Sequence, residues 1–498
     1  MRTHALAFVV SAALSGLSAP LLGAQAASAA PAPGGVLTLV NALAIAKRNS
    51  PTLQNSIAAR RTAAAAVRAA TGAFLPSVNT SFGGGFREGR QAFFQGLALG
   101  ATSSQLSTDV SGSANVNVSL ATLADRRAAL STQDATESDI VSAEQTVRND
   151  VITQYLSALQ AQARAALQDT LVATTTVQLQ LAQARLQVGS GSVLDAQRAE
   201  VANGQQRVAA LNQRNQVAIE IVRLFQRMGI EPIAGVSLDA NLPAAPTLEL
   251  PAVLTMARKS NPQLEGLRSR EEAAGYNASS ARSAYYPSLS LSANVSGQTN
   301  RFTNSGVLID QRRSQTLGAR SSCIRSEEVR AAVGLSNTLG ACSAIAFTPE
   351  QERGIRDAQG DYPFAFTRNP YSLSASFSLP IFNGFRREQQ IEQANVQRRN
   401  TQNDLRGQEL RVVADVTASF LSLTTAQQTV ALQEQNVATA RTALALAQER
   451  YRVGLASIVD LQQARGDYER AETDRITAVY DVQRAFTTLE AAVGRPLR

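Results

Sequence analysis

The sequence predicts a membrane protein that mixes long α-helices with short β-strands and consists of two copies of one unit. Three observations predict this fold class. Two parts of the chain align with each other, which indicates an internal duplication. Two long intervals, 77–231 and 381–495, lack proline and are rich in residues that favour helices. Four shorter segments alternate between apolar and small polar residues, which is typical of strands with two different faces.

The first residues have the features of a secretory signal peptide, which we expect to comprise 1–26 or to extend to residue 30. Arg2 supplies the positive charge, an apolar stretch covers 5–22, and small residues suited to signal cleavage follow. A transmembrane anchor is the alternative, but three serines and a proline interrupt the apolar stretch. We therefore expect an exported protein.

The composition argues against most classes of enzyme. The only histidine, His4, lies within the expected signal peptide, so the mature chain has no imidazole for proton transfer or metal binding. Lys47 and Lys259 are the only lysines, and no glycine-rich phosphate-binding motif is present. We therefore expect no catalytic residues, no metal site and no cofactor. Arginines and acids are interspersed along the chain, so the net charge of +8 does not indicate a nucleic acid partner.

The duplication sets the boundaries of the expected domains. Residues from Leu37 to Ser81 align without gaps on residues from Leu248 to Ser292, at a constant offset of 211 positions. The stretch between the copies contains several prolines, which is typical of a linker. We expect a first repeat at 37–231, a linker at 232–247 and a second repeat at 248–498.

A second pair of matching blocks locates an insertion in the second copy. Residues from Ala182 to Gly189 align on residues from Ala447 to Gly454, and Asp195 aligns on Asp460, now at an offset of 265 positions. The second copy therefore contains extra residues between its two matching blocks. Most of them precede the last alternating segment, so we expect a long loop at 297–369.

Each repeat is expected to end in a helical hairpin. The proline-free intervals predict a helix from Arg386 to Val453, about 100 Å long at 1.5 Å per residue, and a partner from about Ala124 to Val188. Apolar or small residues recur at spacings of three and four, which indicates coiled-coil packing. The turns are expected at residues suited to helix caps, which are Gly189, Gly454, Ser192 and Ser457.

Four strands are expected, at Ser77 to Phe86, Thr108 to Leu120, Ser288 to Ser296 and Tyr371 to Leu379. Strands of a soluble sandwich also alternate, but these segments have the length of tilted membrane strands and carry a small polar face. Four strands are too few for a membrane barrel, whose minimum is about eight. The strands must therefore be pooled between chains, and two chains or three are both compatible with the spacing.

The duplicated plan and its motifs resemble the TolC family of bacterial outer-membrane efflux proteins, from about Leu37 to Arg498. The resemblance rests on signatures that occur in the right order along the chain. They are Ala447 to Asp460 (AQERYRVGLASIVD) with its first-copy counterpart, Ser378 to Gly384 (SLPIFNG) at a strand-to-helix junction, and the proline pairs Pro51/Pro262 and Pro76/Pro287.

The resemblance implies a homotrimer whose 12 strands, four from each chain, form one β-barrel in the outer membrane. It implies that a helical tunnel continues the barrel across the periplasm and narrows at a tip formed by the hairpin turns. It also implies docking to a periplasmic adaptor and an inner-membrane transporter, so that the chain acts as the exit duct of a tripartite efflux pump or of a type I secretion system. Outer-membrane lipid is then a further partner.

The resemblance also assigns candidate site residues near the hairpin turns. The periplasmic gate would involve Asp195, Asp460 and Tyr451, with Tyr451 donating a hydrogen bond to Asp195. Three copies of a carboxylate around a narrow axis raise a barrier to anions. An acid in the first turn of an ordinary helix is the simpler interpretation of Asp460. The turn residues implied to contact the adaptor are Val188, Gly189, Ser192, Val453, Gly454, Leu455 and Ser457.

The expected loop at 297–369 contains the only two cysteines, Cys323 and Cys342. A disulfide between them is compatible with an exported protein, and two free thiols are the alternative. Several arginines in this segment suit an anionic surface, although a solvated basic loop explains them equally well.

Two further functions stay open at the level of sequence. A stand-alone porin requires that each chain closes its own barrel, for which four strands are too few. A structural coiled-coil surface protein requires no strands that face lipid. The resemblance favours the passive duct over both.

Overall fold

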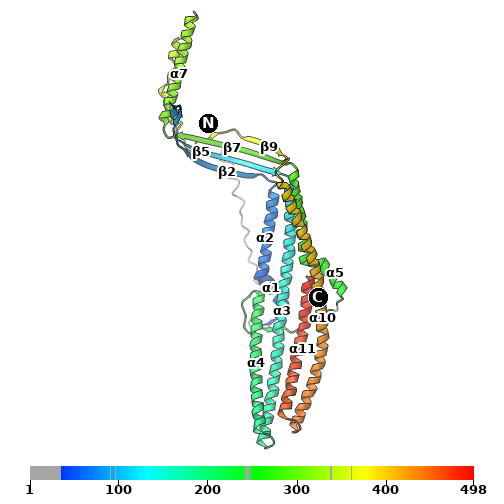
Figure 1. The fold of residues 1–498 in the computed structure, drawn as a ribbon. Coiled ribbons are helices and arrows are strands. Elements are labelled where there is room, and N and C mark those ends of the chain that lie inside the picture. The colour runs from blue at the N-terminus through cyan, green and yellow to red at the C-terminus, as the bar shows by residue number, and fades with distance from the viewer. Residues whose placement is uncertain are drawn as a thin grey trace. The chain divides into compact units, whose positions relative to one another are not determined.

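A computed structural model describes residues 35–89, 91–95, 97–101, 103–241, 246, 248–336, 339–360 and 362–497 (Figure 1). The expected signal peptide and part of the expected linker lie outside the described residues. The chain divides into two compact units. We call them the helical unit, which comprises the chain up to Arg60, Ala135–Leu267 and Asp404–Arg498, and the sheet unit, which comprises Arg61–Asp134 and Arg268–Asn403.

Six main elements of the first copy recur in the same order in the second copy. The pairs are α1 (Leu39–Asn49) with α5 (Leu250–Ser260), α2 (Pro51–Gly72) with α6 (Pro262–Arg282), β2 (Ser77–Arg87) with β7 (Ser288–Phe302), β5 (Gln105–Val118) with β9 (Ser372–Ser378), α3 (Leu120–Gln187) with α10 (Arg386–Arg452), and α4 (Val193–Met228) with α11 (Ile458–Val493). The helices α3 and α10 contain 68 and 67 residues, which confirms the two long helices predicted from the proline-free intervals. Because these intervals contain no proline, no backbone N–H is missing and no proline ring bends the helices.

Within the helical unit, each hairpin returns to the start of its own copy through a glycine. Gly229 ends α4 with φ of +76°, and Gly494 ends α11 with φ of +83°. A Cβ atom on Gly229 would lie 2.5 Å from the carbonyl oxygen of Asn49, and one on Gly494 would lie 2.6 Å from Cδ of Pro262. Both positions therefore require glycine for its conformation and for its lack of a side chain.

A buried tyrosine of the long helix α3 holds the first strand of the described residues. The two-residue strands β1 (Val36–Leu37) and β6 (Ser237–Leu238) pair in parallel. Tyr155 is fully buried, and its hydroxyl lies 2.9 Å from the carbonyl oxygen of Leu37 and 2.8 Å from that of Asp239. Burial raises the pKa of Tyr155 to about 12, because the phenolate is poorly solvated and is repelled by the Asp239 carboxylate. These two short strands were not predicted from the sequence.

The sheet unit contains an antiparallel sheet in the order β2-β5-β7-β9 (Figure 1). The four strands predicted from alternation are therefore confirmed, with ends that differ by a few residues. The two-residue strand β8 (Thr367–Arg368) pairs with the same strand as β9. Among the described residues, β2 and β9 each pair with one neighbouring strand, so each leaves one edge unpaired. A small hairpin of β3 (Gln91–Phe94) and β4 (Leu97–Ala101) was not predicted.

The register sorts the side chains of the sheet into an apolar face and a polar face. On the apolar face, Val78, Ala114, Ala293 and Leu373 lie opposite one another across the four strands. On the polar face, the corresponding row is Asn79, Ser113, Asn294 and Ser372. The apolar side chains at the outer strands are largely exposed in the single chain, at 71% for Val78 and 74% for Leu373. The sheet therefore presents apolar side chains at its outer strands that the chain itself does not cover.

The expectation of a long loop at 297–369 is wrong. The strand β7 continues to Phe302, and the described residues after it form the helices α7 (Ser305–Ala332), α8 (Leu339–Ser343) and α9 (Pro349–Asp357). Asn304 caps α7 by accepting a hydrogen bond from the Gly306 N–H, and no proline interrupts the next 28 residues. Only Ile309 and Glu327 of α7 are buried among the described residues, so the helix has no periodic apolar stripe that would have revealed it.

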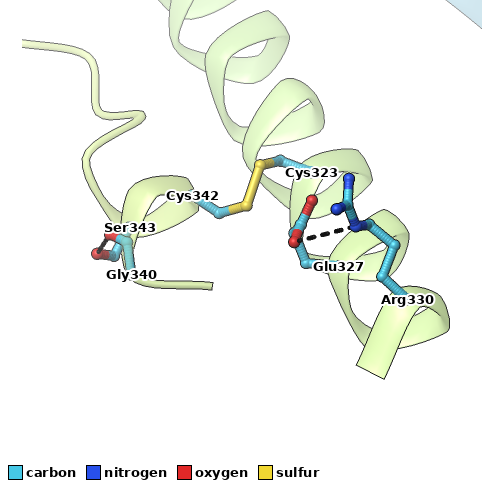
Figure 2. The surroundings of a disulfide bond; sticks show 6 residues. All are labelled: Cys323, Glu327, Arg330, Gly340, Cys342 and Ser343. Atoms are coloured by element: carbon cyan, nitrogen blue, oxygen red, sulfur yellow. Dashed lines mark hydrogen bonds and ion pairs between the residues drawn. A yellow bond between two sulfur atoms is a disulfide. The ribbon is translucent and has the colours of Figure 1, made fainter. Parts of the chain in front are cut away.

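A disulfide connects two of these helices. Cys323 on α7 is bonded to Cys342 on α8, and their Cα atoms lie 5.7 Å apart (Figure 2). Glu327, one turn after Cys323, forms an ion pair with Arg330 of the same helix, at 3.9 Å. The short helix α8 packs against α7, and Cys342 is fully buried there.

Candidate gate and docking tip

Two turns with the same construction join the helices of the two hairpins. Gly189 and Gly454 adopt φ of +75° and +82° after the ends of α3 and α10. The Ser192 hydroxyl accepts a hydrogen bond from the Asp195 N–H at 3.0 Å, and the Ser457 hydroxyl accepts one from the Asp460 N–H at 3.2 Å. The cap-forming residues predicted from the sequence thus hold both turns as expected.

The apolar residues of the turns point into solvent. Val188, Val453 and Leu455 are exposed at 77%, 57% and 79%. Val193 and Leu194, at the start of α4, are also more than half exposed. Exposed apolar groups on adjacent turns provide a surface that a protein partner can cover.

The two acids predicted for the gate both lie in the first turn of a return helix. Asp460 accepts hydrogen bonds from the Ser457 N–H at 3.0 Å and from its hydroxyl at 2.8 Å, which completes a capping box. The backbone N–H of Ser457, and then its hydroxyl, hold the pKa of Asp460 below its usual range. Asp195 occupies the equivalent place in α4, where the positive helix end favours a carboxylate. The contacts of Asp460 are therefore those of an ordinary helix start, and they also keep it ionised.

Tyr451 contacts Arg185, a residue that was not predicted as part of the site. Nη1 of Arg185 donates a hydrogen bond to the carbonyl oxygen of Tyr451 at 2.8 Å, and its guanidinium carbon lies 5.1 Å from the centre of the ring. The described contacts include no hydrogen bond between Tyr451 and Asp195. Burial raises the pKa of Tyr451, with Arg185 opposing the shift and Asp195 adding to it.

Arg185 therefore connects the first hairpin to the second. The carbonyl oxygen of Tyr451, near the end of α10, also accepts a hydrogen bond from the Gly454 N–H at 3.1 Å, and its second lone pair accepts the guanidinium N–H. Tyr451 also packs in a small apolar cluster with Leu181 of α3 and with residues of the second hairpin. The repeated motif contains Arg185 in its first copy, but only the fold shows that it reaches the end of α10.

Further along the helices from the two turns, polar side chains connect the two hairpins. The Gln168 amide donates to the Glu469 carboxylate at 2.9 Å and accepts from Gln206. Arg164 donates to the Thr477 hydroxyl at 2.9 Å. Among the described residues no group of three or more histidines, cysteines or acids is placed to hold a metal ion. No helix of the described part is both long enough and apolar enough to cross a bilayer.

Comparison with known proteins identifies relatives along most of the chain. Residues 42–230 and 351–495 match the family model of the outer membrane efflux protein. The outer membrane efflux protein BepC of Brucella suis biovar 1 (strain 1330) is 24% identical over 371 residues, which cover 72% of this chain and 67% of BepC.

Solved structures of outer-membrane channels share the fold at low sequence identity. The outer membrane protein VceC of Vibrio cholerae has a TM-score of 0.67 and 15% identity, covering 92% of this chain and 97% of VceC. The outer membrane channel CmeC of Campylobacter jejuni has a TM-score of 0.67 and 13% identity, covering 92% of this chain and 85% of CmeC. The chain therefore belongs to the outer membrane efflux protein family and is a protein of the outer membrane that extends into the periplasm.

Proposed function

We propose that the chain is the passive exit duct of a tripartite efflux pump or of a type I secretion system. The observation that carries this proposal is the sheet with one apolar face, one polar face and two unpaired edges. An open strand edge is not tolerated in hydrocarbon, because its backbone groups have no water to bind. The sheet therefore closes with the sheets of other copies, β2 of one chain pairing with β9 of the next.

Three copies give a barrel of 12 strands, which is the assembly that the resemblance to the TolC family implies. In such a barrel the apolar face meets lipid and the serine-rich face lines the lumen. No reaction is needed for passage through a lumen of this kind, and we propose that the chain is not an enzyme. A stand-alone porin is less well supported, because the described sheet has four main strands and two open edges. A coiled-coil surface protein leaves the apolar face unexplained.

The hairpin turns are the proposed gate and docking site. Three copies of Asp195 and Asp460 near the axis would disfavour anions, and the Arg185–Tyr451 contact would hold the two hairpins of each chain together in the closed state. The exposed turn residues Val188, Val453 and Leu455 would meet a periplasmic adaptor that connects the duct to an inner-membrane transporter. Gating then consists of separating the hairpins at the tip.

Removing the charge of Asp460 is expected to weaken the preference of the channel for cations. Asp460→Asn is the appropriate change, because the amide oxygen still accepts a hydrogen bond from the Ser457 N–H and the helix cap is kept. The purified trimer is inserted into planar bilayers, and the reversal potential is measured across a KCl gradient. We expect it to move towards zero, and further towards zero when Asp195→Asn is added.

Ser457→Ala is the matched control for this experiment. It removes the hydroxyl that caps α11 but leaves the Asp460 charge in place, so selectivity is expected to stay as in the unaltered chain. An unchanged reversal potential in the Asp460→Asn, Asp195→Asn double variant would contradict the gate. A chain that forms no channel in the bilayer would contradict the duct itself.

A further inference from the structure

Among the described residues of the four main strands, Asp109 is the only acid on the polar face of the sheet. The register places it between Gly83 of β2 and Gln298 of β7. Arg87, at the end of β2, is the only base on that face of the same strands. The other positions of this face are serine, asparagine, glutamine or glycine, except Phe302 at the end of β7. The charge of Asp109 therefore lies within a face that is otherwise neutral except near its end.

The carboxylate of Asp109 lies over the backbone of Gly83, on the neighbouring strand. A Cβ atom on Gly83 would lie 2.7 and 2.9 Å from the two carboxylate oxygens. Because side chains alternate along a strand, a Cβ at Gly83 would point to the same face as the side chain of Asn79. The carboxylate therefore lies on the polar face, in a space that glycine at position 83 leaves open.

No base on the polar face lies close enough to neutralise Asp109. The residue is exposed, and the contacts among the described residues include no hydrogen bond or ion pair of its carboxylate. Arg87 lies four positions beyond Gly83, roughly 14 Å along the strand at 3.4 Å per residue. That distance exceeds the Debye length of about 10 Å at 0.1 M salt. The charge of Asp109 therefore acts mainly on the solvent and ions next to it.

We propose that Asp109 is a charge-selectivity residue of the duct, where three copies repel anions and attract cations in the outer part of the barrel. The inference rests on the proposed function, in which three chains pool their strands and the polar face lines the lumen. Asp109 lies four positions from the Gln105 end of β5 and nine from the Val118 end, which leads into α3. It belongs to the sheet unit, whereas the proposed gate residues Asp195 and Asp460 belong to the helical unit.

The size of the proposed barrel allows a charge on its wall to act across the lumen. Twelve strands that are spaced about 4.8 Å apart and tilted by about 40° enclose a barrel roughly 24 Å across between backbones. The distance from wall to axis, roughly 12 Å, is close to the Debye length of about 10 Å at 0.1 M salt and far above that of about 3 Å at 1 M. The three carboxylates are therefore expected to act on ions throughout the lumen at 0.1 M, and only close to the wall at 1 M.

The reactivity of a cysteine placed beside Asp109 measures the local charge without depending on the gate. Ser111→Cys places a thiol two positions from Asp109 on the same face of β5, roughly 7 Å along the strand. Its rate of modification is measured in purified trimers with a cationic and an anionic methanethiosulfonate reagent of similar size. The disulfide between Cys323 and Cys342 leaves neither of them as a free thiol. We expect the ratio of cationic to anionic rates at 0.1 M salt to fall about threefold or more with Asp109→Asn, and to change much less at 1 M.

Ser292→Cys is the matched control for this measurement. Ser292 lies opposite Asn115 on the polar face, six positions and roughly 20 Å from Asp109 along the sheet. Because this distance is about two Debye lengths at 0.1 M salt, the ratio of rates there is expected to be the same with and without Asp109→Asn. Asp109→Glu keeps the charge and is expected to keep the ratio at Ser111→Cys. Asn300→Cys, opposite Ser107, provides a second thiol position if Ser111→Cys does not assemble.

The conductance of the channel provides a second measurement of the same charge. In a chain that carries Asp195→Asn and Asp460→Asn, the proposed gate no longer contributes to selectivity. Adding Asp109→Asn is expected to bring the reversal potential still closer to zero at 0.1 M salt and to have little effect at 1 M.

Two results would overturn the inference. One is a ratio of rates at Ser111→Cys that Asp109→Asn leaves unchanged at 0.1 M salt. The other is an equal fall of the ratio at Ser292→Cys, which would mean that the substitution acts on the whole barrel and not through a local charge. If the same trimers still conduct in planar bilayers, the proposed duct stands and only the role of Asp109 fails. Chains that form no channel contradict both.

Discussion

Valine in place of Gly494 is expected to lower the free energy of unfolding of the helical unit by about 2 to 5 kcal/mol. Part of this loss comes from the backbone, because φ of +83° is unfavourable for a β-branched residue. The rest comes from overlap, since the new Cβ would lie 2.6 Å from Cδ of Pro262. Pro262 begins α6, so the clash cannot be relieved without moving the start of that helix.

Gly229, the equivalent glycine of the first copy, provides a second test, and Gly466 inside α11 provides a control. Gly229→Val is expected to have a loss of the same size, because its Cβ would meet the Asn49 carbonyl at 2.5 Å. Gly466→Val lies inside α11 with nothing within 4 Å of its Cβ, and valine and glycine differ little in helix propensity, so it is expected to be nearly neutral. Thermal unfolding followed by circular dichroism compares the three variants. Equal losses at Gly466 and Gly494 would contradict the close packing assigned to Gly494.

Arginine in place of Val295 is expected to prevent stable insertion of the barrel, whereas arginine at the adjacent Asn294 is expected to be tolerated. Val295 lies opposite Gly112 on the apolar face, and Asn294 lies opposite Ser113 and Ser372 on the polar face. Both residues lie near the middle of β7. An arginine that faces lipid at the middle of the bilayer costs about 2 to 4 kcal/mol in each chain, but one that faces a wet lumen does not.

Refolding into lipid vesicles distinguishes the two faces of the sheet. The folded fraction of each variant is measured from its resistance to protease and from its mobility on gels without heating. We expect Val295→Arg to reduce the folded fraction strongly and Asn294→Arg to match the unaltered chain. The reverse order would mean that the lipid-facing side has been assigned wrongly, and equal effects would mean that the sheet does not lie in a bilayer.

The parts of the fold that could be predicted are those with a local signature. The absence of proline placed the start of α10 at Arg386, as observed, and its end within one residue. Strict alternation located four strands. The pairing of β1 with β6 has no such signature, because each strand has two residues and is held by Tyr155 from a distant helix. The helix α7 was missed because few of its side chains are buried.

The candidate site shows the same division between local and distant effects. Gly189, Ser192 and their second-copy counterparts could be predicted, since a helix cap depends on neighbouring residues only. The contact of Arg185 with Tyr451 joins residues 266 positions apart. Charge and exposure at such places follow from tertiary packing, which the spacing of residues does not encode.

The most direct test of the proposed duct is the number of chains in the particle extracted from the outer membrane. Native mass spectrometry of the detergent-solubilised protein measures this number without reference to any contact described above. A barrel shared by three chains, as the resemblance to the TolC family implies, predicts a mass of three mature chains, and loss of that particle in Val295→Arg but not in Asn294→Arg. A stable, membrane-inserted particle with the mass of a single chain would contradict the shared barrel.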